Sequence, residues 1–244
     1  MLRRLQRLYH HGYLERPRCQ IDYFQSGSRR IAYGLDNKGA AWIKSELSPA
    51  FHQLDWKQKS SVGRLFLEHA LLVSDIMVAV EVACRNRMHI RLLSPDDLQT
   101  SKSRDLFHWK VDIGQRQKTG IIPDRVFGLE INGQQSWYFL EADRGTMPIT
   151  RGRLDQTSFQ RKLLAYEATW SQNLHRTRFG WQRFRVLTVT TSKQRVQGIK
   201  QACQNLAHGH GLFLFLDAAA LAKHGDILTL PWQTSQPDKT ETLT

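Results

Sequence analysis

Three acidic residues and one lysine have the types and spacing that metal-assisted phosphate chemistry requires. Asp124 precedes one apolar stretch, and Glu141 and Asp143 end the next one. Asn132-Gly133 separates the two stretches and is a dipeptide typical of tight hairpin turns. Because a tight hairpin brings its two ends together, we expect Asp124 and Glu141 to converge at one end of a sheet.

Converging carboxylates can hold Mg²⁺ or Mn²⁺, since these hard cations prefer oxygen ligands and share phosphate oxygens with a substrate. Such a metal polarises a phosphodiester and lowers the pKa of an attacking water. Lys162 follows in a segment of helical pattern, with Tyr166 one turn later on the same face. A lysine beside the metal stabilises charge on the phosphate or orients the nucleophile. The candidate catalytic residues are therefore Asp124, Glu141, Asp143 and Lys162, the three acids are candidate metal ligands, and water is the expected nucleophile.

The spacing of apolar residues predicts the elements that position these side chains. Residues 61–84 form one long apolar segment, which predicts a helix buried on nearly all sides. Glu68 and His69 interrupt it and are candidate assisting residues, as is Tyr166. After a polar, loop-rich stretch over 94–120, the pattern predicts strands over 121–131 and 136–141, a helix over 156–171, a strand over 184–190, a helix over 192–206 and a strand over 212–216. This order indicates a mixed α/β domain with the hairpin at the centre of its sheet.

The first residues of the chain indicate a smaller module. Residues 2–14 have the period of a short amphipathic helix that Gly12 ends, and strands are expected over 29–35 and 39–43. Helix, strand, turn and strand in this order suggest the second half of a winged helix. We accordingly expect a partial winged-helix module over 1–44, a connector over 45–60, the main domain over 61–230 and a polar, disordered tail over 231–244.

The charge of the chain favours a polyanionic partner. Its 244 residues carry a formal net charge of +13, with 41% hydrophobic residues that allow a substantial core. Between Arg144 and Asn205 there are twelve basic residues and only two acids, Asp155 and Glu167. DNA is the expected partner, and the candidate DNA-binding residues are Arg3, Arg4, Arg7, Arg29, Arg30, Arg144, Arg151 and Arg153.

Other classes of protein are disfavoured by the sequence. There is no apolar run of 18 or more residues and no secretory signal pattern, so neither a membrane partner nor export is expected, and the cytoplasm is the expected location. Cys19, Cys84 and Cys203 are far apart and have no CxxC spacing. This argues against disulfides and a zinc site, and predicts reduced, mostly buried thiols.

The acids and the lysine also carry a resemblance to a known superfamily. Residues 61–216 resemble the PD-(D/E)xK nucleases, which place Pro-Asp and then an acid-x-Lys motif on a central hairpin after a buried helix. Position 143 is Asp where the superfamily usually has Lys. Some branches carry the lysine on the next helix, where Lys162 lies. The resemblance implies a restriction-endonuclease-like sheet and metal-dependent cleavage of DNA.

A closer resemblance is to the replication-relaxation family of plasmid proteins, which includes relaxases of restriction-nuclease type. The matching residues are Arg3-Arg4-Leu5, Gly12-Tyr13-Leu14, Leu67-Glu68-His69, Ile122-Pro123-Asp124, Phe139-Leu140-Glu141-Ala142-Asp143-Arg144-Gly145-Thr146, and Lys162-Leu163 with Tyr166. The family normally begins with a complete winged helix, whereas this chain begins at the third helix of one. The resemblance implies nicking or cleavage of DNA in plasmid replication or mobilisation, with other replication or mobilisation proteins, or a second copy in a homodimer, as partners.

Simpler interpretations of the same residues stay open. Acids at strand ends can simply face water, Asp143 can pair with Arg144 or Lys162, and Lys162 can lie on a solvated helix face. Glu68 and His69 can be satisfied polar groups of a core, and Tyr166 a packing aromatic with a bonded hydroxyl. On this view the chain is a non-catalytic DNA-binding regulator built on a degenerate nuclease fold.

The charge distribution generates a prediction about DNA affinity. Because each neutralised phosphate releases condensed counterions, the logarithm of the affinity should fall with the logarithm of salt concentration with a slope of several units. Fluorescence anisotropy titrations over a salt series measure this slope. An affinity that does not change with salt would rule out phosphate-dominated binding.

Overall fold

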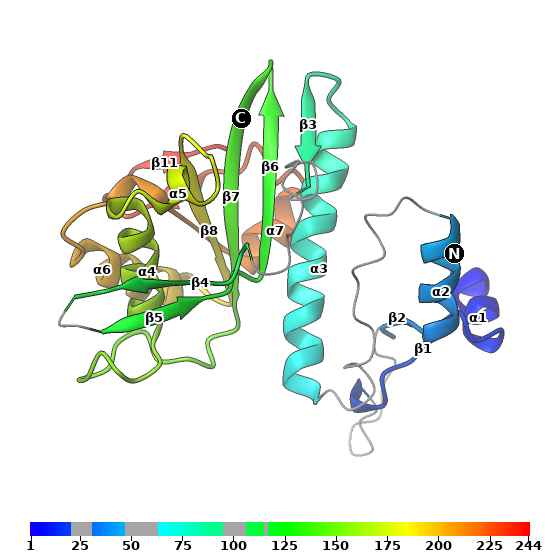
Figure 1. Ribbon diagram of the computed structural model, residues 1–244. Coiled ribbons are helices and arrows are strands. Elements are labelled where there is room, and N and C mark those ends of the chain that lie inside the picture. Colours follow the sequence, from blue (N-terminus) through cyan, green and yellow to red (C-terminus); the bar gives the residue numbers. More distant parts are fainter. Residues whose placement is uncertain (21–30, 47–62, 95–105, 115–116) are drawn as a thin grey trace. The chain divides into compact units, whose positions relative to one another are not determined.

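The computed structural model describes residues 1–244 apart from 21–30, 47–62, 95–105 and 115–116 (Figure 1). The chain forms two compact units, Met1–Leu71 and Leu72–Thr244. The boundary between them falls within helix α3 (Arg64–Arg85). The three candidate acids and Lys162 all belong to the second unit.

Before α3, the described residues of the first unit form two α-helices and one pair of short strands. Its elements are α1 (Leu2–His10), β1 (Leu14–Glu15), a 3-10 turn (Arg18–Gln20), β2 (Gly34–Leu35) and α2 (Asn37–Glu46). β1 and β2 pair antiparallel. α1 ends before Gly12, whose φ of 73° is the left-handed conformation that glycine adopts readily. The prediction of a short first helix ended by Gly12 is confirmed.

The strand expected over 39–43 is wrong, because these residues lie inside α2. Ala40 and Ala41 favour a helix, and the carboxylate of Asp36 accepts a hydrogen bond from the Asn37 amide at 2.6 Å where the helix begins. Gly39 lets α2 approach the segment between α1 and β1, since a Cβ at position 39 would lie 2.2 Å from the Tyr13 carbonyl oxygen. The partial winged helix therefore stays a prediction.

The second unit is built on one mixed sheet, and this confirms the expected α/β class. The sheet has seven strands in the order β11-β10-β9-β8-β7-β6-β3. Their bounds are β3 Ile90–Leu93, β6 Arg125–Ile131, β7 Gln134–Asp143, β8 Phe184–Thr190, β9 Phe213–Asp217, β10 Trp232–Thr234 and β11 Thr240–Glu241. β7, β8 and β9 pair in parallel, whereas the other neighbours pair antiparallel.

The expected hairpin is formed by β6 and β7, which pair from Arg125–Leu140 to Ile131–Gln134. Asn132 and Gly133 both have positive φ, 50° and 81°, as a tight two-residue hairpin turn requires. The strand at the centre of the sheet is β8 and not the hairpin, because β9, β10 and β11 extend the sheet on the far side.

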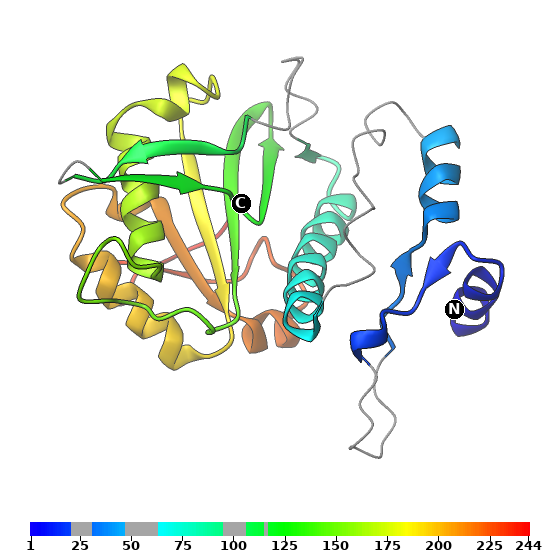
Figure 2. The same ribbon diagram turned by 60° about the horizontal axis from the view of Figure 1, so that its bottom comes forward.

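Side-chain alternation along β7 sorts residues between two cores, one on each face of the sheet (Figures 1 and 2). Trp137 and Phe139 face a core that includes α4 (Phe159–Ser171) and α6 (Lys193–Gln204). Tyr138 and Leu140 face the other core, which includes α3. Because side chains alternate with a period of two, Glu141 and Asp143 lie on the α4 side. The remaining helices are α5 (Leu174–Thr177) and α7 (Ala218–His224).

Helix α3 is confirmed as an element, but it is buried on one face only. Its buried side chains are Val73, Ile76, Val80, Ala83 and Cys84, whereas Leu65, Phe66, Leu71, Val78 and Val82 are exposed. The expectation of burial on nearly all sides is therefore wrong. A single sheet face can cover only one stripe of a helix.

Two segments expected to be irregular contain strands. Within 94–120 lies a separate hairpin of β4 (Trp109–Asp112) and β5 (Lys118–Ile121), whose inward side chains pack against the α4 core. The tail over 231–244, expected to be disordered, forms β10 and β11. Trp232 is fully buried there, with its indole N–H donating to the Ile227 carbonyl at 3.1 Å. Short polar strands of this kind are held by packing that local sequence does not reveal.

The buried C-terminal strands generate a prediction about stability. Trp232→Ala should lower the free energy of unfolding by about 3–5 kcal/mol, because it leaves a large cavity in the core. Trp170→Ala, at a side chain of α4 that is 42% exposed, is the matched control and should cost at most about 1 kcal/mol. Urea denaturation measures both values, and equal losses would contradict the structure of this segment.

Candidate functional site

Glu141 is the buried acid at the end of the hairpin, with only 2% of its surface exposed. Its Oε1 accepts a hydrogen bond from the Tyr166 hydroxyl, and its Oε2 accepts one from Lys162 Nζ, each at 2.5 Å. Lys162 and Tyr166 are one turn apart on α4, as the sequence indicates, and both reach the same carboxylate. The structure therefore brings three of the sequence-predicted site residues into direct contact.

Asp124 stands at the start of the hairpin, beside the end of β7. Its amide donates to the Leu140 carbonyl at 3.0 Å, and its Oδ2 accepts from the Ala142 amide at 2.7 Å. The Asp124 carboxylate is thereby fixed next to the strand position that Glu141 occupies. The expected convergence of the two acids at one end of the hairpin is what the structure shows.

The charges of this cluster depend on burial and on mutual contact. Burial raises the pKa of Glu141 above its ordinary value, although the Lys162 ammonium partly opposes this. Burial alone would lower the pKa of Lys162, but the Glu141 carboxylate outweighs it and holds that pKa above the ordinary value. Burial and the Glu141 charge raise the pKa of Tyr166 well above its usual range. At neutral pH Lys162 is therefore charged, and Tyr166 is a neutral hydrogen-bond donor.

Asp143 is held in a separate ion pair on the same face of the sheet. Arg195 donates to it through Nε at 2.6 Å and through Nη2 at 2.9 Å, and the Thr190 hydroxyl donates at 2.6 Å. Burial would raise the pKa of Asp143, but these hydrogen bonds and the Arg195 charge outweigh it and lower that pKa. Arg195 also donates to the Met147 carbonyl at 2.6 Å and so fixes the chain that leaves β7.

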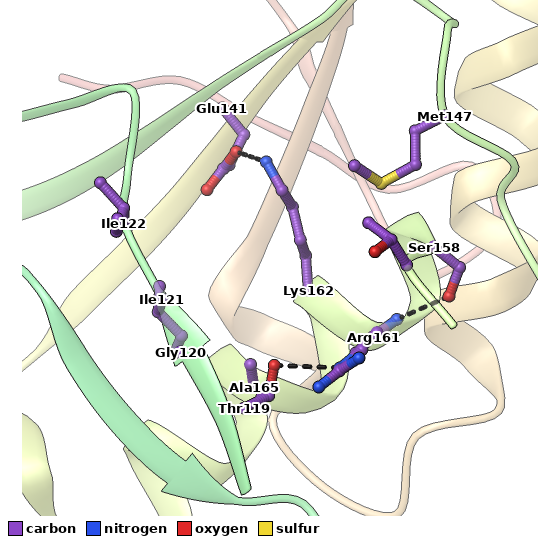
Figure 3. Close-up of a pocket in the computed structure, with 11 residues that line it drawn as sticks. Thr119, Gly120, Ile121, Ile122, Glu141, Met147, Ser158, Arg161, Lys162 and Ala165 are labelled. Carbon is purple, nitrogen blue, oxygen red and sulfur yellow. Dashed lines mark hydrogen bonds and ion pairs between the residues drawn. The ribbon is translucent and has the colours of Figure 1, made fainter. Parts of the chain in front are cut away.

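A pocket of about 290 Å³ opens beside Glu141 (Figure 3). One wall is the end of β5 and the residue after it, the opposite wall is the loop that leads from β7 to α4, and α4 forms the floor. Figure 3 shows Glu141 with Lys162 at one end of this space and Arg161 at the other. The lining residues are Thr119, Gly120, Ile121, Ile122, Glu141, Met147, Thr157, Ser158, Arg161, Lys162 and Ala165.

A family model described as replication-relaxation matches residues 1–181 of this chain. The chain belongs to the replication-relaxation family. The matched segment contains Asp124, Glu141 and Lys162, whereas Thr190 and Arg195 lie beyond it. No curated protein and no solved structure matches the chain. Membership in the replication-relaxation family associates the chain with DNA and with plasmid replication or mobilisation.

In the part of the chain that the structure describes, no helix is long and apolar enough to cross a bilayer.

Glu68 and His69 lie on α3 in the first unit of this replication-relaxation chain. Glu68 accepts a hydrogen bond from Arg64 at 3.1 Å across one helical turn, and His69 is half-buried. Neither residue lines the pocket beside Glu141. Their assisting role stays a prediction.

The arginines expected to bind DNA occupy both units. Arg3, Arg4 and Arg7 are exposed on α1. Arg151 and Arg153 are exposed on the loop before α4, and Arg144 is half-buried at its start. Arg29 and Arg30 lie outside the described residues.

At least four of the twelve basic residues between 144 and 205 pair with carboxylates of the same chain, so the charge available to a partner is smaller than the count suggests. These residues are Arg153, Lys162, Arg185 and Arg195. The three cysteines are free, and Cys84 and Cys203 are buried, as expected.

Two residues that shape the site were missed from the sequence. Arg161 lines the pocket, with its Nε on the Thr119 hydroxyl at 3.0 Å. Because Arg161 lies next to Lys162 in a segment rich in basic residues, its type and position do not distinguish it from an ordinary surface charge. Arg195 is distant in sequence from Asp143, and no local pattern links them, although Ser192 as the N-cap of α6 fixes where that helix begins. Only the parallel pairing of β7 with β8 brings Arg195 to Asp143.

The site offers few protein ligands for a metal ion. Among the described residues, no three His, Cys, Asp or Glu side chains gather closely enough to hold an ion. Asp124 and Glu141 supply two carboxylates at one place, while the carboxylate of Asp143 is engaged by Arg195. Mg²⁺ commonly binds through one or two carboxylates, with waters and substrate phosphates as its other ligands. The residues present fit such a two-carboxylate site, and they do not form a cage made only of protein ligands.

The ion pair of Asp143 with Arg195 generates a prediction about pH and stability. Because the folded-state pKa of Asp143 is lowered, its stabilisation is complete above the ordinary pKa and is lost as pH falls through the lowered value. Asp143→Asn should remove this acid-range loss. It should also cost about 3–5 kcal/mol at neutral pH, since it leaves the largely buried Arg195 without its counterion.

The control for this prediction is Asp155→Asn, which breaks the exposed pair of Asp155 with Arg153. It should change the free energy of unfolding by at most about 1 kcal/mol. Urea denaturation over an acidic pH series measures both variants. A pH profile of Asp143→Asn identical to that of the wild type would contradict the assigned role of the pair.

Proposed function

We propose that the second unit is a divalent-metal-dependent DNA nuclease of the PD-(D/E)xK kind, which nicks or cleaves DNA in plasmid replication or mobilisation. The observation that carries the proposal is the convergence of Asp124 and Glu141 at the end of the hairpin, where Glu141 lines a pocket and contacts Lys162. The mixed sheet with its hairpin and the following helix supports the same superfamily. Family membership supports the setting in plasmid biology.

Asp124 and Glu141 would hold Mg²⁺ or Mn²⁺ in this proposal. Each carboxylate oxygen has two lone pairs, so the oxygens of Glu141 that already accept hydrogen bonds retain acceptor capacity. When bound, the metal would polarise the scissile phosphodiester and lower the pKa of a water molecule. Asp143 would assist from the same face of the sheet by fixing the end of β7 through Arg195, while its role as a ligand stays a prediction.

Lys162 supplies a fixed positive charge at the edge of the pocket. Its contact with Glu141 holds the ammonium group where negative charge develops on a phosphate during cleavage. Tyr166 is not assigned the role of nucleophile, because the residue is buried and its hydroxyl donates to Glu141. The tyrosine instead orients the carboxylate, and water attacks the phosphorus.

Binding to the rest of the DNA would depend on exposed arginines. Arg151 and Arg153 lie on the loop that leads to the pocket residues Thr157 and Ser158. They would contact phosphates on either side of the cleaved bond. The basic face of α1 in the first unit would add further phosphate contacts. Other replication or mobilisation proteins, or a second copy of the chain, are proposed as further partners.

A second candidate is a regulator that binds DNA without cutting it. Two observations favour it: among the described residues no three potential metal ligands gather at one place, and the Glu141 carboxylate forms an ion pair with Lys162. In that case the acid pair and its lysine would only stabilise the fold. A metal-dependent nicking assay separates the two candidates.

The nuclease proposal predicts the behaviour of acid variants. Asp124→Ala should abolish Mn²⁺- or Mg²⁺-dependent nicking of supercoiled DNA, with a loss of orders of magnitude, because the metal loses a ligand. DNA affinity should be unchanged or higher, since one negative charge near phosphate is gone. Asp75→Ala removes an exposed acid on α3 and should nick as the wild type does. Gel assays of nicking and anisotropy titrations measure the two effects.

Further variants sharpen this test. Glu141→Gln should also be inactive, Lys162→Ala should nick more slowly while retaining more metal affinity than the acid variants, and Tyr166→Phe should retain activity if water attacks. The nuclease proposal fails if the wild type cleaves neither supercoiled nor single-stranded DNA with any divalent metal. It also fails if Asp124→Ala nicks as fast as the wild type, and the regulator then takes its place.

A further inference from the structure

The pocket beside Glu141 contains a second cation, Arg161, which forms no ion pair with a carboxylate of the described residues. Arg161 donates through Nε to the Thr119 hydroxyl at 3.0 Å and through Nη1 to the Asp155 carbonyl at 2.6 Å. Both acceptors are uncharged, and no acidic side chain among the described residues forms an ion pair with Arg161. The guanidinium is thus held in place by neutral groups, with N–H donors left for an anion.

The backbone at this end of the pocket cannot replace Arg161 as the anion site. The first amides of α4 are already engaged: Phe159 donates to the Pro148 carbonyl, Gln160 to the Ile149 carbonyl and Arg161 to the Ser158 hydroxyl. An anionic ligand would therefore be recognised by side chains, first by Arg161 and then by the hydroxyl groups of Thr119 and Ser158.

Apolar side chains contribute to both walls of the pocket, beside its polar groups. Ile121 and Ile122 lie on one side of the pocket and Met147 on the other, with the Lys162 side chain between them in the view of Figure 3. Ile122 is 65% exposed although it is a large apolar residue. An apolar slot with a cation at one end suits a flat ring system that carries a phosphate.

The size of the pocket limits what this ligand can be. Its volume of about 290 Å³ is at the lower end of the range for small-molecule sites. This space suits one base with its sugar, whereas a base pair within a double helix is far wider. The chemistry and the size together indicate a single unpaired nucleotide.

We propose that this pocket binds one unpaired nucleotide of a DNA strand, with its phosphate on Arg161 and its base between Ile122 and Met147. The inference rests on the proposed nuclease function and names its substrate class, since the nucleotide would lie next to the bond at the acid pair. The preferred substrate is then single-stranded or locally melted DNA. A duplex is a substrate only after one base leaves its stack, which costs a few kcal/mol.

The experiment compares binding of a short labelled single strand with binding of the same sequence as a duplex. Anisotropy is measured in EDTA at fixed salt, so that the result does not depend on metal or cleavage. Arg161→Gln is compared with Arg176→Gln, which removes an exposed arginine outside this pocket. Ile122→Ser is compared with Val78→Ser, at an exposed valine of α3. Thermal unfolding of each variant checks its fold.

Arg161→Gln should weaken single-strand binding about tenfold, and Arg176→Gln should weaken it much less, because of these two arginines Arg161 alone lines the pocket and can make a charge-assisted contact there. Ile122→Ser should weaken single-strand binding several-fold, and Val78→Ser should not change it. Duplex binding should respond alike to the two arginine variants. A 2-aminopurine base placed along the strand should brighten at one position on binding, and this signal should be lost in Ile122→Ser.

Three results would overturn the inference. The first is an equal loss of single-strand affinity in the two arginine variants, and the second is equal affinity of the wild type for single strand and duplex. The third is competition by free thymidine monophosphate as effective as by the strand, which would identify a free nucleotide as the ligand. Because binding is measured without metal, these results are independent of the nicking assay. If the wild type does not nick DNA but the variants show the expected differences in single-strand binding, the nuclease proposal alone fails. If the wild type nicks DNA but these binding differences are absent, this inference alone fails.

Discussion

The burial of the Glu141 carboxylate at the end of an internal strand is the constraint on which the site depends. A carboxylate with almost no exposure is costly unless each oxygen has a hydrogen-bond partner. Lys162 and Tyr166 supply these partners from one face of α4, which fixes the rotation of that helix about its axis. With α4 fixed, Arg161 and Ala165 face the pocket.

Where a local pattern determines a conformation, the sequence was sufficient. Asn132-Gly133 specified the hairpin turn, and the apolar, β-branched run over 184–190 coincides with β8. The capping position of Ser192 was also local, since its hydroxyl accepts from the Arg195 amide. The acid pair could be expected because the hairpin alone brings Asp124 to the end of β7.

What could not be predicted depends on partners that are distant in sequence. The need for glycine at position 39 comes from the Tyr13 carbonyl, and the burial of Trp232 comes from pairing with β9 and from a core that includes residues of α3. Arg195 reaches Asp143 only after β8 pairs in parallel with β7. The exposed stripe of α3 was missed for the same reason: how many faces of an apolar helix are covered depends on packing partners that are distant in sequence.

The two sides of the pocket differ in how they are tied to the protein. β7 is hydrogen-bonded to a neighbour on each side, so exchange of its amide hydrogens requires the seven-stranded sheet itself to open. Among the residues that the structure describes, β5 pairs with β4 alone, in a hairpin outside that sheet, and its amides become accessible when this small ladder separates. We therefore expect slower amide exchange on the strand that carries Glu141 than on β5, which carries Ile121. The width of the pocket can change in this way without any displacement of Glu141.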